Sequence, residues 1–184
     1  METADYYEFL ECLAMTKKIC PFTIHALCLM TNHFHMSIET GEVEIWKIMH
    51  RLLRTYAANY NIKYKLTGHL FENRYVGRLI EDDRYFLEVS RYIHLNPVKA
   101  GMVKDPAEYE YSSYGLYATG DKIRTRGKAT NMIADLIETK RVLDMFCGDS
   151  REQDCIFVEE KVSHDDQEKL IMKEMKENEL WLPC

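Results

Sequence analysis

The amino-acid sequence predicts an α+β fold built around an antiparallel sheet. Helical and strand-like hydrophobic periodicities alternate along the first half of the chain in the order helix, strand, strand, helix, strand, helix. The first two strands are separated by a short turn, which favours antiparallel pairing. The 184 residues are enough for one well-buried core and too few for two full domains. We therefore expect one domain followed by a smaller appendage.

The first predicted helix begins at Thr3, which can cap it, and ends near Lys17 and Lys18. Its apolar residues recur at spacings of three and four, as a single buried helix face requires. A nearly continuous apolar run follows at residues 22–30. This composition is typical of a strand that is covered on both faces.

Residues 33–39 are the second strand of a predicted hairpin, after a turn at Thr31 and Asn32. Apolar and polar residues alternate strictly in this strand, which gives it one apolar and one polar face. The apolar face carries Phe34, Met36 and Ile38, and the polar face carries His33, His35, Ser37 and Glu39. Both histidines therefore project from the same face.

An amphipathic helix is predicted at residues 43–61 and a further strand at residues 70–80. Asp82 or Asp83 can cap the next helix, which should stop by Pro97 because proline restricts the residue before it. These elements complete the predicted sheet and its helices.

Residues 1–117 form the predicted main domain, and residues 118–184 are expected to form a helical extension. In this extension a loop is predicted at residues 122–128 and a helix at residues 132–146. From Ser150 onward the chain is acidic and polar, which is typical of a tail that is partly disordered or docks onto a partner.

The charge distribution favours a nucleic-acid partner, although the formal net charge of the chain is −6. Residues 44–104 contain eleven Lys and Arg residues against six Asp and Glu residues, so the acidic excess lies toward the two ends. A basic region binds phosphates through counterion release. Any single cation in it could equally belong to a solvated helix face.

The composition also limits where in the cell the protein is expected. No apolar run approaches the roughly 20 residues that a membrane span needs, and the start lacks the basic and then apolar pattern of a secretory signal. We therefore expect a cytoplasmic protein. The six cysteines occur without a C-x-x-C pair, which predicts reduced thiols and argues against a structural zinc module.

Two groups of residues could carry chemistry. His33 and His35 place two imidazoles side by side on one strand face, where they could chelate a metal ion or be ordinary polar residues. On the helix that follows Asp83, Tyr92 and Asn96 lie four residues apart at one edge of the apolar stripe. A phenol and an amide could thus face one small volume, although a core-margin aromatic and a helix-end residue would show the same spacing.

Four segments together resemble the single-tyrosine HUH transposases, in particular the REP-associated tyrosine transposases of the IS200-like superfamily. They are residues 29–35 (Leu-Met-Thr-Asn-His-Phe-His), 71–75 (Phe-Glu-Asn-Arg-Tyr), 91–101 (Arg-Tyr-Ile-His-Leu-Asn-Pro-Val-Lys-Ala-Gly) and 111–114 (Tyr-Ser-Ser-Tyr). The order and spacing of the four segments also match. The resemblance spans residues 1–117 and implies that they form the catalytic domain.

The resemblance implies a ferredoxin-like antiparallel sheet with helices on one face. It implies that His33, His35 and Asn96 bind Mg²⁺ or Mn²⁺ and that Tyr92 is the nucleophile. The expected enzyme cleaves and rejoins single-stranded or hairpin DNA through a 5′-phosphotyrosine intermediate. The alternative is a non-catalytic DNA-binding remnant or domesticated descendant of such a transposase.

The residues expected to contact DNA flank the nucleophile helix: Arg74, Tyr75, Arg78, Arg91 and Lys99. Arginine and lysine would bind phosphates, and the tyrosine would stack on an unpaired base. The resemblance also leaves two arrangements open, in which Tyr92 serves the histidines of its own chain or those of a partner in a homodimer.

One feature of the family's pattern is not found at the start of this sequence. Family members begin with a strand before the first helix, and in a ferredoxin-like sheet this strand is central. Here the first helix comes at once, so the neighbouring strands are expected to have unpaired backbone groups. A second protomer, a start site placed too late or decay of the gene would each account for this gap.

Overall fold

The computed structural model describes residues 2–71, 73–119, 127–140 and 155–161. Four strands form one sheet: β1 (Phe22–Leu29), β2 (His33–Thr40), β3 (Val76–Ile80) and β4 (Cys155–Lys161). Their order across the sheet is β1-β2-β4-β3, and every neighbouring pair is antiparallel. The predicted α+β class with an antiparallel sheet is confirmed.

Six helical segments are described. They are α1 (Thr3–Ile19), α2 (Ile45–Tyr64), α3 (Asp83–Lys99), the 3-10 helix η1 (Pro106–Glu108), α4 (Tyr114–Thr119) and α5 (Lys128–Leu136). The first two strands form the predicted hairpin, with Cys28 opposite His35 in its register. The third strand is shorter than predicted, because Leu70 and Phe71 precede it as irregular chain packed against the core.

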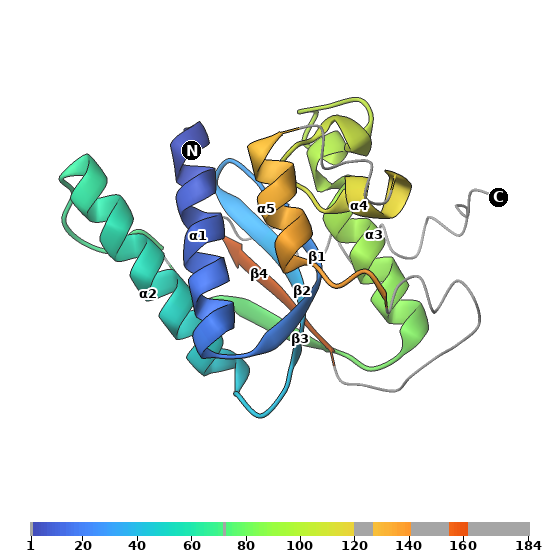
Figure 1. Cartoon of the computed structure of the whole chain (residues 1–184), viewed down its shortest axis with the longest axis horizontal. Coiled ribbons are helices and arrows are strands. Elements are labelled where there is room, and N and C mark those ends of the chain that lie inside the picture. The colour runs from blue at the N-terminus through green and yellow to red at the C-terminus, as the bar shows by residue number, and fades with distance from the viewer. Residues whose placement is uncertain (1, 72, 120–126, 141–154, 162–184) are drawn as a thin grey trace.

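The helices cover both faces of the sheet, and not one face as the resemblance implied. On the first face α1, α2 and α5 pack over the sheet (Figure 1). The first core cluster lies there and includes Leu10, Leu13, Met36, Ile38, Leu52, Ile133 and Val158. On the second face α3 packs over a smaller second core cluster, which includes Ala26, Cys28, Phe86, Val89, Ile93, Cys155 and Phe157. The polar face of β2 is therefore buried beneath α3.

Strand β4 occupies the central place in the sheet between β2 and β3. Val158 pairs with Met36 on one side and with Gly77 on the other, so both edges of β4 are hydrogen-bonded. This strand comes from the segment that the sequence assigned to an extension. The gap expected beside β2 is thus filled by a strand of the same chain, which gives the backbone groups of β2 and β3 their partners.

Several helix boundaries differ from the predicted ones, and α2 runs over Ile45–Tyr64 rather than residues 43–61. The first turn of α1 is capped by Glu2, whose backbone N–H donates to Asp5 at 2.7 Å, and not by Thr3. Helix α3 continues past Pro97 to Lys99, because a proline in the last turn removes only one helical hydrogen bond. Helix α5 ends at Leu136, after which Ile137 makes a β-bridge.

The remaining predictions for the extension fall mostly outside the described residues. The predicted loop at residues 122–128 is described only at its last two positions, and the predicted helix at residues 132–146 only up to residue 140. Of the segment after Ser150, the structure describes β4 alone.

Glu160 on β4 is a buried carboxyl group in the core. It pairs with Phe34 across the sheet and is 2% exposed. Neither of its carboxyl oxygens has a hydrogen-bond partner within the described part of the chain. Burial penalises the charged form and raises the pKa of this carboxyl to about 8. Glu160 is therefore protonated at neutral pH.

We expect Glu160→Gln to stabilise the protein at alkaline pH. The unfolded carboxyl loses its proton near the ordinary value of 4.5, whereas the folded one keeps it up to about 8. The unfolded state therefore binds fewer protons in this window, and the free energy of unfolding of the wild type falls as pH rises through it. Glutamine keeps the shape without ionising.

Urea unfolding across this pH window measures the difference. The gain of Glu160→Gln over the wild type should grow from about pH 4.5 to about pH 8. Glu11→Gln, which changes an exposed carboxylate on α1, is the matched control and should show no such growth. A difference that does not vary with pH would contradict a buried, neutral Glu160.

Candidate active site

Two imidazoles lie side by side on β2, beneath α3. The ring centroids of His33 and His35 are 4.8 Å apart, and His35 is fully buried. The Nδ1 atom of His33 is 2.7 Å from the side-chain oxygen of Asn32. That oxygen accepts, so Nδ1 donates in this hydrogen bond, and Nε2 is the ring nitrogen that a metal would use.

Helix α3 brings Tyr92 to these imidazoles. The ring centroid of Tyr92 lies 5.4 Å from that of His35 in an edge-to-face arrangement. Phe157 of β4 contacts both rings, with its centroid 6.0 Å from each. The structure thus gathers both histidines and the tyrosine of the predicted site in one chain.

The helix reaches this position because its start is fixed. Asp82 accepts a hydrogen bond from the backbone N–H of Tyr85 at 2.7 Å, as an N-cap does. Phe86, Val89 and Ile93 then pack against the second core cluster. With these positions buried, the helical period places Tyr92 at the edge of the packed stripe.

Asn96 lies one turn after Tyr92 and is half-buried. Its side-chain Nδ2 donates to the backbone carbonyl of Tyr92 at 2.9 Å. The amide oxygen, which is the atom that a metal ligand would use, is on the other arm of the same group.

One acidic neighbour of the histidines, Glu159 on β4, was not predicted from the sequence. It pairs with His35 across the sheet, and its Oε1 lies 3.9 Å from the Nδ1 atom of His35. The residue is 6% exposed. The alternation of Cys155, Phe157 and Glu159 along a β-compatible segment was the available signal, but the polar composition around it obscured it.

The residues expected to contact DNA are not all at this site. The Nζ atom of Lys99 lies 5.1 Å from the centre of the Tyr92 ring. Arg91 is half-buried on the same helix, and Arg78 pairs with Phe157 on the neighbouring strand.

The other two predicted DNA contacts precede β3. Arg74 is exposed at that position. Tyr75 packs against the first core cluster, which lies on the opposite face of the sheet from α3. The structure therefore does not bring the Tyr75 ring to the histidines and Tyr92.

The histidine of the Tyr-Ile-His-Leu-Asn-Pro segment is part of the scaffold. His94 is buried, and its Nε2 lies 2.7 Å from the Oγ of Ser113. Burial lowers the pKa of His94 to about 3, so the ring is neutral at physiological pH. The Oγ of Ser113 also accepts a hydrogen bond from the backbone N–H of Leu27 at 3.0 Å. The backbone N–H of Ser113 donates to the carbonyl of Leu27 at 2.9 Å. These bonds fasten α3 to β1.

We expect Ser113→Ala to destabilise the fold by about 1–3 kcal/mol, because it leaves buried groups of His94 and Leu27 without their hydrogen-bond partner. Denaturant unfolding measures this loss. Ser37→Ala is the matched control: Ser37 is equally buried on β2, and its hydroxyl has no hydrogen-bond partner among the residues described. Equal losses in both variants would contradict the fastening role of Ser113.

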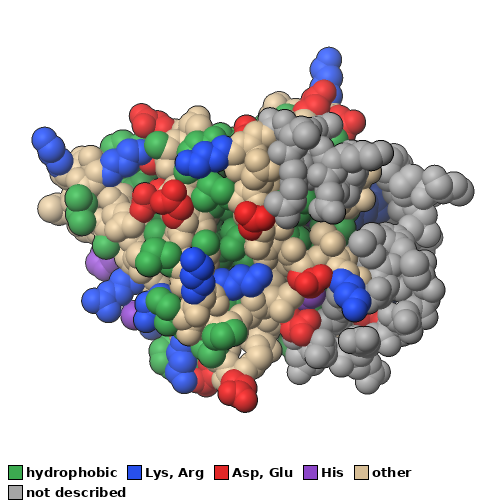
Figure 2. Space-filling model, in the orientation of Figure 1, with side chains coloured by type: hydrophobic (Ala, Val, Ile, Leu, Met, Phe, Trp, Pro, Cys, Tyr) green, Lys and Arg blue, Asp and Glu red, His purple; other side chains and the backbone are tan. Residues whose placement is uncertain are grey.

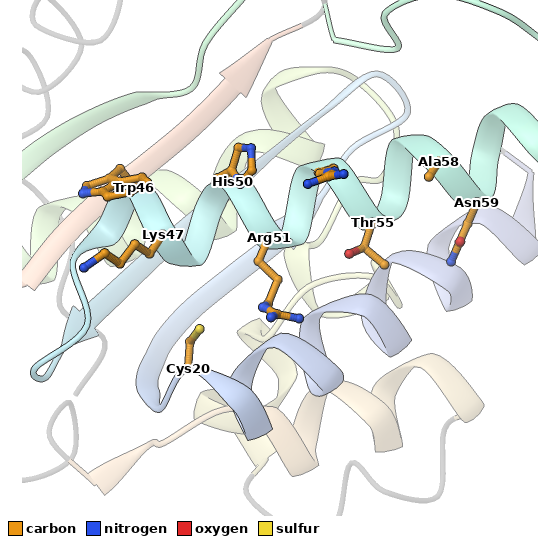
Figure 3. Close-up of a pocket in the computed structure, with 9 residues that line it drawn as sticks. Cys20, Trp46, Lys47, His50, Arg51, Thr55, Ala58 and Asn59 are labelled. Atoms are coloured by element: carbon orange, nitrogen blue, oxygen red, sulfur yellow. The ribbon is translucent and has the colours of Figure 1, made fainter.

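A basic groove lies on the first face of the sheet, away from His33 and His35. It has a volume of about 560 Å³ and is lined by α2 together with Cys20 at the end of α1. Its basic residues are Lys47, His50, Arg51 and Arg54. Arg51 and Thr55 point from α2 toward α1 (Figure 3). Across the face seen in Figure 2, Lys and Arg side chains are interspersed with Asp and Glu.

An antiparallel sheet that holds two imidazoles against a helix-borne phenol is the arrangement that the resemblance implied for a single-tyrosine transposase. The comparisons with known proteins agree. The sequence profile of the family described as "Transposase IS200 like" matches residues 2–96, just over half of the 184 residues. The chain belongs to the IS200-like transposase family.

A curated relative points the same way. The chain is 27% identical over 124 residues to a Haemophilus influenzae protein described as a REP-associated tyrosine transposase. This match covers 60% of the chain and 69% of the relative. No solved structure matches the chain significantly. Among the described helices, none is long and apolar enough to cross a membrane.

Proposed function

We propose that this protein cleaves and rejoins single-stranded or hairpin DNA, with Tyr92 as the nucleophile. The observation that carries the proposal is that the ring of Tyr92 lies next to the paired imidazoles. Its centroid is 5.4 Å from that of His35, and the centroids of His35 and His33 are 4.8 Å apart. Membership of the IS200-like transposase family supports a transposase-like function. The geometry supports an active site formed within one chain.

The donor set fits a divalent ion. His33 and His35 offer imidazole nitrogens, and a carboxylate oxygen of Glu159 lies 3.9 Å from the Nδ1 atom of His35. Asn96, one turn after Tyr92 on α3, would add an amide oxygen. Mixed nitrogen and oxygen donors suit Mg²⁺ or Mn²⁺, and imidazole favours Mn²⁺. When bound, such an ion neutralises the scissile phosphate and polarises its phosphorus.

The residues of the chain supply the rest of the reaction. The Oη of Tyr92 attacks the phosphorus and forms a phosphotyrosine bond, while the bond from phosphorus to the 3′ oxygen breaks. The phenol proton leaves to solvent, and the 3′ oxygen takes up a proton to become a hydroxyl. The ammonium of Lys99 lies over the Tyr92 ring and stabilises negative charge there. A second 3′ hydroxyl can reverse the step and join strands.

Lys99, Arg91, Arg78 and Arg74 would hold the phosphates that flank the scissile bond. The first three lie on α3 and β3, which border the Tyr92 site, and Arg74 is exposed just before β3. Phosphate contacts of this kind make binding weaken as salt rises. Tyr75 is left out of this set, because its ring packs against the first core cluster.

We expect Tyr92→Phe to abolish covalent capture of a labelled hairpin oligonucleotide, because the variant lacks the attacking oxygen. Denaturing gel electrophoresis of the reaction measures capture. Tyr85→Phe removes a hydroxyl from the same helix, where Tyr85 packs at the margin of the second core cluster, and it should capture normally. Undiminished capture by Tyr92→Phe would refute the assignment. A wild-type protein that binds hairpin DNA but nicks none would favour the non-catalytic alternative.

We expect His35→Ala to lower metal-dependent nicking at least about 10–100-fold, since even residues behind a metal ligand have effects of this size. Rates measured against Mn²⁺ and Mg²⁺ concentration test this. A chelator should stop the wild type, and Mn²⁺ should restore it at lower concentration than Mg²⁺. His50→Ala, on the opposite face in the α2 groove, is the control and should leave the metal dependence unchanged. Nicking that persists in excess chelator would rule out the metal role.

A further inference from the structure

A second group of potential metal ligands lies at the other end of β2 from His33. His25, Glu39 and Cys155 each offer one ligand atom, and these three atoms lie within 4.8 Å of one another. Within the described ranges this is the one group of three His, Cys, Asp or Glu residues that is so close. None of the three belongs to the proposed catalytic set.

The fold builds this group from three adjacent strands. In the register of β2 and β4, Glu39 stands directly opposite Cys155. On the other side, β1 has a bulge between Ile24 and Ala26, and His25 is the extra residue. A bulge redirects the side chain that it carries, and here the His25 ring meets Phe86 of α3, at 5.2 Å between centroids. All three side chains therefore face α3.

The group is shielded from solvent. His25 is 1% exposed and Cys155 is fully buried, while Glu39 is half-buried. The Nε2 of His25 lies 2.9 Å from the Oε2 of Glu39, and the Sγ of Cys155 lies 3.9 Å from the same oxygen. An ion bonded at about 2.0–2.3 Å to each donor would set donor separations of roughly 3.3–3.8 Å. Small side-chain rotations would close the group around one ion.

We propose that His25, Glu39 and Cys155 form a zinc site that fastens β4 to β1 and β2. Imidazole, carboxylate and thiolate are the three donor types that Zn²⁺ takes in proteins. A thiolate and a carboxylate carry two negative charges, which the ion neutralises, so the occupied site suits its buried surroundings. The thiolate also separates this site from the nitrogen and oxygen donors near Tyr92, because soft ligands select zinc over Mg²⁺ or Mn²⁺.

The competing description needs no metal. In it His25 and Glu39 form a buried ion pair, and Cys155 is a small apolar residue beside them. The two descriptions differ in the state of the sulfur, which is a metal-bound thiolate in one and a thiol in the other.

Cobalt(II) substitution of the full chain shows directly whether the Cys155 sulfur is a metal-bound thiolate or a thiol. The protein is stripped with a chelator under reducing conditions and titrated with Co²⁺. We expect one equivalent to produce a thiolate-to-cobalt charge-transfer band together with the intense visible bands of a tetrahedral ion, with water as the fourth ligand beside the three side chains. Added Zn²⁺ should remove both, and it should raise the melting temperature of the stripped protein.

Three variants locate the signal. Cys155→Ser should lose the charge-transfer band, and Glu39→Gln should weaken cobalt binding at least about tenfold. Cys28→Ser is the matched control, because Cys28 is also fully buried in the second core cluster, and it should keep the band. Circular dichroism of each variant establishes that it is folded.

The double variant His33→Ala, His35→Ala separates this proposal from the proposed function. It should lose nicking and keep the charge-transfer band, so the two ideas can fail independently. A wild-type chain with no charge-transfer band, or a folded Cys155→Ser variant that retains it, would overturn the zinc site. The ion pair without metal would then describe these residues.

Discussion

The structure depends on the backbone hydrogen bonds that β4 makes on both of its edges. Strands β2 and β3 do not pair with each other, and β4 gives each of them its partner. Unpaired N–H and C=O groups in the middle of a covered sheet would be costly, because water could not reach them. The sheet therefore forms only when β4 is in place, and the sheet in turn fixes His33 and His35 relative to α3.

The side chains of β4 extend this dependence to the chemistry. Alternation sends Phe157 and Glu159 to the face of α3, where they contact His35 and, in the case of Phe157, Tyr92 as well. Val158 goes to the first core cluster on the opposite face. One strand thus joins the two cores and forms part of the wall of the candidate site. The position of Tyr92 then follows from the cap at Asp82 and from the packing of α3 on the second core cluster.

Local periodicity was enough to predict the hairpin, the shared face of the two histidines, and the place of Tyr92 at the edge of the apolar stripe of its helix. These are properties of neighbouring residues, and alternation or a spacing of four fixes them. The identity of the central strand is different, because β4 pairs with residues more than a hundred positions away. Its short apolar stretch lies in an acidic, polar segment, where composition favours disorder. Glu159 and Cys155 were missed for the same reason.

The polar face of β2 also shows why pattern alone could not assign roles to its residues. Beneath α3, His35 and Glu39 each meet side chains of other strands, and these partners differ along the length of β2. His35 meets Glu159, whereas Glu39 meets His25 and Cys155. The end with imidazole and oxygen donors suits a hard ion that activates a phosphate, and the end with a thiol suits a softer ion that holds strands together. A single alternating strand can thus serve two different chemistries, because each end is completed by residues that only the tertiary fold supplies.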